Sequence, residues 1–280
     1  EQLLLGIDAW DFDWQDDYRL VQPLALPRGT RLAFEFVYDN SDANADNPHR
    51  PPVRVRFGPQ SSDEMGTLTF AVALADPADR TALRKALLER DLEKLPNAWN
   101  LLLERARLSR AAGDLQAALA DLSRAKRVSP GAAQIEVELG LCAVAAGNAA
   151  GAESHFRRAL ELAPGLGSAH LELGTVLARR GHLQSALPHF EAAVTALPNA
   201  PEAHNNLATA HFALGRLDAA ERHYRRAVAL APDYFAAWLN LGRVLAAAER
   251  PAEARQALEA ARRLRPNDAA LAAALQALPR

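Results

Sequence analysis

Apolar residues recur with two different spacings along the chain. From about residue 99 to residue 268 they return every three or four positions, which is the period of an amphipathic helix. Before residue 76 they alternate with polar residues, which is the pattern of half-buried strands. The change of period predicts an α+β multidomain protein, with a β-rich segment followed by an all-α segment.

Three alternating runs give the expected strands of the first segment. The runs are 32–38, 53–57 and 68–74. The stretch 39–52 is rich in Asn, Asp and Pro and is expected to be a long loop. These features predict an antiparallel β-sandwich fragment over residues 1–76. Leucines 83, 87 and 88 then predict a helix over 79–95, within a connecting segment 77–98.

A 34-residue period runs through residues 99–268. Five kinds of position keep one register: a proline, a glycine, two alanines, and a bulky residue between the alanines. The series are Pro96, Pro130, Pro164, Pro198, Pro232 and Pro266; Gly113, Gly147, Gly181 and Gly215; Ala118, Ala152, Ala186, Ala220 and Ala254; Ala125, Ala159, Ala193, Ala227 and Ala261; and Leu122, Phe156, Phe190, Tyr224 and Leu258. Five series in one register predict five tandem helical hairpins.

Each repeated residue type has a structural reason. A glycine ends the first helix, because this position often requires a left-handed backbone; Glu249 replaces it in the last copy. A proline stops the second helix, and the alanines let helices approach to about 8–10 Å. With the Leu-Gly pairs at 139–140, 173–174 and 241–242, the pattern resembles the tetratricopeptide repeat family. The resemblance implies a superhelix over residues 99–268, whose first helices line a concave groove, and a terminal capping helix over 269–280.

Composition and charge exclude several classes. The 280 residues are 49% hydrophobic and 24% charged, as in folded domains. A net charge of −2 gives no electrostatic footprint for nucleic acid, and no apolar run approaches the ~20 residues of a membrane span. The single cysteine, Cys142, excludes an intrachain disulfide and leaves the redox compartment open. Because the chain begins at Glu1 rather than Met, we expect a fragment or a processed product.

The first 75 residues carry the motifs of a second family. These are Leu26-Pro27-Arg28-Gly29-Thr30, Tyr38-Asp39-Asn40-Ser41, Asn47-Pro48, Pro51-Pro52 and Ser62-Asp63-Glu64-Met65. They resemble the C-terminal half of the copper type II, ascorbate-dependent monooxygenases in a bacterial form. In that family the methionine at the Met65 position is the thioether ligand of the oxygen-activating copper, and a thioether favours Cu(I). The resemblance implies copper in the full-length protein and an extracytoplasmic location, periplasmic or secreted.

The copper site is incomplete in this chain. The family supplies two histidines from an His-x-His strand, but no His-x-His occurs here, and the only histidine before residue 155 is His49. Either these ligands lie upstream of Glu1, which we expect, or the module has degenerated. We therefore expect Met65 alone not to hold copper tightly, and we identify no catalytic residue and no certain cofactor in the chain.

Other conspicuous side chains have ordinary structural interpretations. His155, His189 and His223 share the 34-residue period, but equivalent positions in adjacent hairpins are too far apart for one metal ion. We expect them to be a repeated surface feature. His204 and His211 lie ~10 Å apart along one helix and fail the same test. Cys142 is expected to be a buried small hydrophobe.

The sixth residue of each hairpin forms a series of its own. Its members are Glu104, Glu138, Glu172, Asn206 and Asn240. This position should point away from the packed face, and in several tetratricopeptide scaffolds the matching asparagines hold a peptide by its backbone amides. An amide both donates and accepts, so it can pair with any sequence. With Asn205 and Arg243 the series predicts a groove that is acidic in its first three hairpins and prefers an extended segment with basic residues at one end. The alternative is an ordinary solvated helix surface.

Two functions follow from these patterns. The first is a protein–protein interaction scaffold that binds a peptide or partner protein in the groove. The second is the C-terminal part of a copper-dependent monooxygenase, whose repeats recruit a substrate or partner. Five complete repeats support the first, against one copper ligand out of three for the second.

Overall fold

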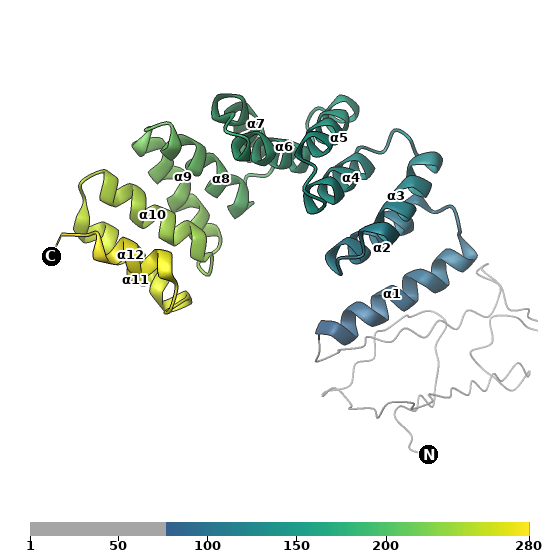
Figure 1. The fold of residues 1–280 in the computed structure, drawn as a ribbon, viewed down its shortest axis with the longest axis horizontal. Helices are drawn as coiled ribbons and strands as arrows, with labels where there is room; N and C mark the ends of the chain where they lie inside the picture. Colours follow the sequence, from purple (N-terminus) through teal and green to yellow (C-terminus); the bar gives the residue numbers. More distant parts are fainter. Residues whose placement is uncertain (1–76, 280) are drawn as a thin grey trace, which may run out of the picture. The chain divides into compact units, whose positions relative to one another are not determined.

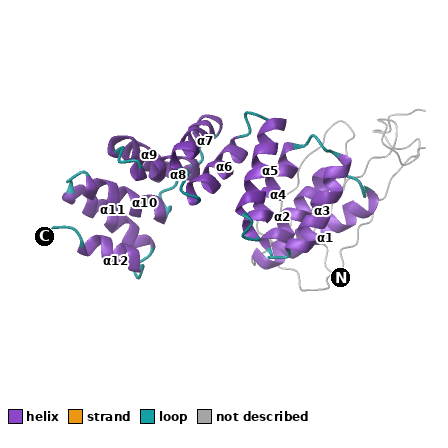
Figure 2. Cartoon of the chain, turned by 45° about the horizontal axis from the view of Figure 1, so that its top comes forward, coloured by secondary structure: helices purple, strands orange, loops and turns teal. Residues whose placement is uncertain are grey.

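The computed structural model of the protein describes residues 77–279. The chain divides into two compact units, residues 1–79 and 80–280, and the described residues lie almost wholly in the second unit. This part is a superhelix of twelve helices joined by short loops (Figures 1 and 2). The β-sandwich expected over residues 1–76 lies outside the described residues.

Ten of the helices form five consecutive hairpins. The bounds are α2 Trp99–Ala111 and α3 Leu115–Val128; α4 Ala133–Ala145 and α5 Ala149–Leu162; α6 Gly167–Arg179 and α7 Leu183–Ala196; α8 Pro201–Ala213 and α9 Leu217–Leu230; α10 Phe235–Ala247 and α11 Pro251–Leu264. Every second helix ends two residues before the proline of the period, because a proline disfavours helical backbone in the residue before it.

One further helix flanks the hairpins at each end. Helix α1 spans Pro77–Lys94, and its Leu92 joins the core of the first hairpin. Helix α12 spans Ala269–Gln276 and begins with an Asp268 side chain that accepts a hydrogen bond from the Leu271 amide. It packs on α11 and α10, where Leu271 is 1% exposed, so this helix covers apolar surface of the last hairpin.

Each first helix ends in the same left-handed turn. In the third hairpin Gly181 has φ of +83°, and the next amide, of His182, donates to the carbonyl of Leu177. This is a Schellman motif, which satisfies carbonyls that the helix end leaves free. The equivalent residue in the last hairpin, Glu249, adopts φ of +58° although it carries a side chain. The backbone conformation is therefore kept even where the glycine is lost.

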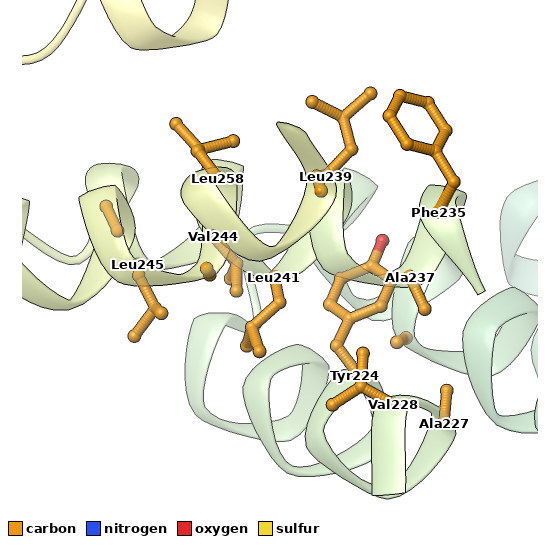
Figure 3. Close-up of a cluster of buried hydrophobic side chains, with 14 of the residues drawn as sticks. Tyr224, Ala227, Val228, Phe235, Ala237, Leu239, Leu241, Val244, Leu245 and Leu258 are labelled. Carbon is orange, nitrogen blue, oxygen red and sulfur yellow. The ribbon is translucent and has the colours of Figure 1, made fainter. Parts of the chain in front are cut away.

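Small residues set the distance between the two helices of a hairpin. A Cβ placed on Gly174 would lie 2.7 Å from the Phe190 ring, and one on Gly140 would lie 2.4 Å from the Phe156 ring. The alanines of the second helices are fully buried beside these contacts. In the fourth and fifth hairpins Tyr224, Leu241, Val244 and Leu258 fill the corresponding space (Figure 3).

The superhelix is built mainly from contacts between neighbours in sequence. Each second helix packs on the first helix of the next hairpin, from α3 on α4 to α9 on α10. First helices also contact one another across hairpins, as α2 does with α4, α6 with α8, and α8 with α10. Within this unit the first helices α4, α6 and α8 therefore lie on the inner side of the curve (Figure 1).

Candidate functional site

The residues of the expected groove lie on consecutive first helices. Glu104 is on α2, Glu138 on α4, Glu172 on α6, Asn206 on α8 and Asn240 on α10. We call these five residues the inner row. Their surroundings differ from hairpin to hairpin, so the row is not a uniform surface.

The carboxylates of the first two hairpins have partners within the chain. Glu104 forms an ion pair with Arg84 of α1. Glu138 is only 5% exposed and accepts hydrogen bonds from Arg107 at 2.8 Å and Arg110 at 3.1 Å, both on α2. The expectation that the row is acidic through three hairpins is corrected here, because these arginines cover Glu138 and offset the charge of both carboxylates.

Glu172 differs from both of its equivalents. Within the described part of the chain no hydrogen bond or ion pair reaches its half-buried carboxylate. Burial raises the pKa of Glu172, and the nearby charges of Arg110 and Arg179 oppose this rise only in part. The middle of the inner row therefore holds a carboxylate that is partly desolvated and only partly compensated by nearby positive charge.

Amide side chains continue the row on α8 and α10. The Asn206 amide donates to Thr175 Oγ1 at 3.3 Å, the Asn205 amide donates to Asn206 Oδ1 at 3.2 Å, and the Asn240 amide donates to Asn205 Oδ1 at 3.4 Å. These bonds are longer than the usual 2.9–3.0 Å, so they are weak. Thr175 was not predicted from the sequence, although it shares the 34-residue register with Arg243, which is exposed at the far end of the row.

The repeated histidines are not the surface feature that their period predicted. Each lies half-buried inside its hairpin, opposite a residue 19 positions earlier. His155 Nδ1 is 2.8 Å from Glu136 Oε2. The Nδ1 atoms of His170 and His189 are 3.0 Å apart, and those of His204 and His223 are 3.1 Å apart. A second series with the same 34-residue spacing could have revealed these contacts. It consists of Glu136, His170, His204 and Trp238 on the first helices, and its first three members face the histidines of the second helices.

The tautomers of the histidine pairs follow from their neighbours. His170 Nε2 and His204 Nε2 lie 2.9 and 3.1 Å from the carbonyls of Pro164 and Pro198. A carbonyl only accepts, so each Nε2 carries the proton and each Nδ1 accepts from the partner histidine. Trp238 Nε1 donates to the Pro232 carbonyl in the same way.

Three histidines in and beside these pairs have lowered pKa values, which favours their neutral form. Burial, with the partner His204 and nearby His211 and Arg222, lowers the pKa of His223 to about 4. Burial also lowers the pKa of His189 and that of His211, whose ring stacks on His223 at 5.9 Å. Among the described residues no three His, Cys, Asp or Glu side chains converge as a metal site.

Two further sequence expectations concern Cys142 and membrane insertion. Cys142 is 2% exposed, which confirms the expected buried position. Of the helices in residues 77–279, none is both long and apolar enough to span a bilayer. The candidate copper ligand Met65 lies outside the described residues.

Comparison with solved structures shows the fold. A chain of the APC/C hetero-tetramer Cut9–Hcn1 matches with a TM-score of 0.65 and 18% identity, over 71% of this chain and 40% of that one. YrrB, described as a TPR protein with an unusual peptide-binding site, matches with a TM-score of 0.55 and 24% identity, over 68% and 97%. Pseudomonas aeruginosa PilF matches with a TM-score of 0.59 and 16% identity, over 62% and 79%. The chain thus spans less than half of the Cut9–Hcn1 chain that it matches.

Comparison of sequences identifies the family. No curated protein matches the chain, and none of the matches supports the monooxygenase resemblance of residues 1–75. A family model of the tetratricopeptide repeat matches residues 103–167, 171–234 and 205–269, which together are more than half of the sequence. These matches fall on the five hairpins that carry the 34-residue period. The chain therefore belongs to the tetratricopeptide repeat family.

Proposed function

We propose that this chain is an interaction scaffold that binds an extended segment of a partner protein along the inner row. Tetratricopeptide repeats bind peptides or proteins, and one structure similar to this chain is described as having a peptide-binding site. The observation that carries the proposal is the amide series Asn205, Asn206 and Asn240, which crosses two neighbouring first helices.

The weakness of the amide contacts favours this function. The amide groups of Asn206 and Asn240 donate hydrogen bonds of 3.3 and 3.4 Å to Thr175 and Asn205. A peptide backbone offers both N–H and C=O groups, so it can replace such contacts with shorter ones at little cost. A backbone-directed site tolerates many sequences, and it sets the direction and position of the bound segment.

The two sides of the amide series differ in charge. Glu172 supplies a carboxylate on α6, and Arg243 supplies an exposed guanidinium on α10. A segment bound along the first helices would therefore lie near a negative group at α6 and near a positive group at α10. This refines the expected preference for basic residues at one end of the ligand, because Glu104 and Glu138 are already paired with arginines.

A peptide selection tests the proposal. A displayed library of random dodecapeptides is selected on the 280-residue chain and, in parallel, on the Asn206→Ala/Asn240→Ala variant. We expect peptides that bind the wild-type chain and lose most of their affinity for the double variant. The matched control is Asn267→Ala, an exposed asparagine in the turn before α12. Equal binding to the wild type and the double variant would remove the inner row as the binding site.

A further inference from the structure

The inner row contains three carboxylates, and among the described residues two of them have an arginine partner and the third has none. Arg84 pairs with Glu104, and Arg107 and Arg110 together hold Glu138. At the third position, Glu172, no side chain within the described residues forms an ion pair or a hydrogen bond. The same structural position thus has a guanidinium partner in two hairpins and lacks one in the next.

The surroundings of Glu172 make the missing partner costly. A half-buried carboxylate loses hydration and needs compensation from hydrogen bonds or an opposite charge. Glu172 receives no hydrogen bond within the described residues, and the charges of Arg110 and Arg179 offset its burial only in part, so its pKa is raised. Neither nearby arginine bonds to it, because Arg110 is already bonded to Glu138, and Arg179 forms no hydrogen bond or ion pair with Glu172 in the described part of the chain.

We propose that Glu172 is a subsite for a cationic side chain, lysine or arginine, of the bound segment. The inference rests on the proposed function and adds the chemistry of the partner at one position. An ammonium or guanidinium group would form a charge-assisted hydrogen bond with the carboxylate, of the kind that Arg107 and Arg110 form with Glu138. The ligand would thereby complete the pattern of the row in the third hairpin.

The neighbouring amides place this cation within the bound segment. Successive first helices lie about 10 Å apart, and an extended chain advances about 3.3 Å per residue. The cationic residue is therefore about three residues from the backbone groups that Asn206 contacts. It is about six residues from those that Asn240 contacts. Only the cationic position is read through a side chain.

The test compares two proteins and two peptides. A dodecapeptide enriched on the full 280-residue chain is synthesised with its conserved Lys or Arg and, separately, with Gln at that position. Binding of each to the wild type and to Glu172→Gln is followed by fluorescence anisotropy. Glutamine keeps the size of the side chain and removes the charge. We expect Glu172→Gln to weaken binding of the cationic peptide roughly ten- to a hundredfold, the effect of one charge-assisted hydrogen bond.

A second variant separates the local effect from net charge. Glu191→Gln removes an exposed carboxylate from α7 of the same hairpin, away from the inner row. This variant should bind the cationic peptide as the wild type does, and the Gln peptide should bind all three proteins alike. An equal loss in Glu191→Gln and Glu172→Gln would overturn the subsite and leave only general electrostatic attraction.

The outcome also separates this inference from the proposed function. If enriched peptides depend on Asn206 and Asn240 but show no excess of Lys or Arg, the groove stands and the Glu172 subsite is wrong. If no enriched peptide depends on those asparagines, the proposed function is wrong, and the inference is overturned with it. Circular dichroism of each variant confirms that the helices are intact.

Discussion

The ring of Phe190 on α7 lies directly against the backbone of Gly174 on α6, so that a Cβ at residue 174 would be 2.7 Å from the ring. Real side chains do not approach so closely, so an added methyl group must displace the ring. The same relationship joins Gly140 to Phe156 and Gly242 to Leu258. The glycine of the Leu-Gly pair is thus a packing residue, and it fixes how closely the two helices of a hairpin approach.

Gly174→Ala is expected to destabilise the protein. Overpacking costs about 1–3 kcal/mol, which exceeds the gain of about 1 kcal/mol that alanine brings to a helix. The melting temperature should fall. The control is Gly165→Ala, since a Cβ at this turn residue meets no atom within 4 Å. A rise in melting temperature for Gly174→Ala would show that Phe190 moves aside freely.

Ala186→Leu is expected to destabilise the third hairpin by about 1–3 kcal/mol, because Ala186 is 0% exposed and lies against the neighbouring helices. The measurement is thermal unfolding followed by circular dichroism. Ala229→Leu, at an exposed site on α9, should change the melting temperature little. Equal effects of the two substitutions would contradict the burial of the alanine series.

The left-handed turns predict two opposite effects. Gly181→Val should destabilise, because a β-branched residue is strained at φ of +83°. Glu249→Gly should stabilise by about 1 kcal/mol, because it relieves a non-glycine residue at φ of +58°. The free energies of unfolding from urea titrations measure both. A destabilising Glu249→Gly would mean that the glutamate side chain contributes more than the strain costs.

Stability should fall as the pH drops from about 6.5 towards 4. The folded protein keeps His223 neutral because its pKa is lowered to about 4, whereas the unfolded chain takes up a proton near pH 6.5. The folded state therefore binds fewer protons than the unfolded state in this pH range. The contribution of His223 to stability is fully present above pH 6.5 and is lost as the pH falls from 6.5 to 4.

Melting temperatures at pH 7.5 and pH 5 measure the contribution of His223. The decrease between these two values should be smaller in His223→Gln than in the wild type. His182→Gln, at an exposed histidine, should leave the decrease unchanged. An identical pH dependence in all three proteins would show that the pKa of His223 does not change on folding.

The helical part of the fold could be predicted from the sequence, because the same pattern of residues occurs in five consecutive hairpins. Gly181 and Ala186 could be assigned a backbone conformation and a buried position from their register alone. The partners of side chains could not be assigned in this way. Arg107 and Arg110 reach Glu138 from another helix, 31 and 28 residues earlier in the chain, and a 34-residue period does not specify such contacts.

The histidines show the same limit. Their period was visible, but the partner of His189 is His170, 19 residues away, and the link depends on how two helices of one hairpin face each other. A search for two periodic series with a constant offset would have found it. The copper monooxygenase interpretation of residues 1–75, with Met65 as a ligand, remains a sequence-based prediction.

Packing between sequence neighbours has a consequence for how the protein unfolds. The most extensive packing lies within each hairpin, and beyond its own two helices a hairpin packs mainly on its neighbours in sequence, so distant hairpins are coupled only through those between them. A segment bound across α6, α8 and α10 would contact three hairpins at once and so add a direct link between the third and the fifth, which the chain joins mainly through the fourth. Ligand binding should therefore sharpen the melting transition as well as raise its midpoint, and the steepness of the transition would report how many hairpins one ligand spans.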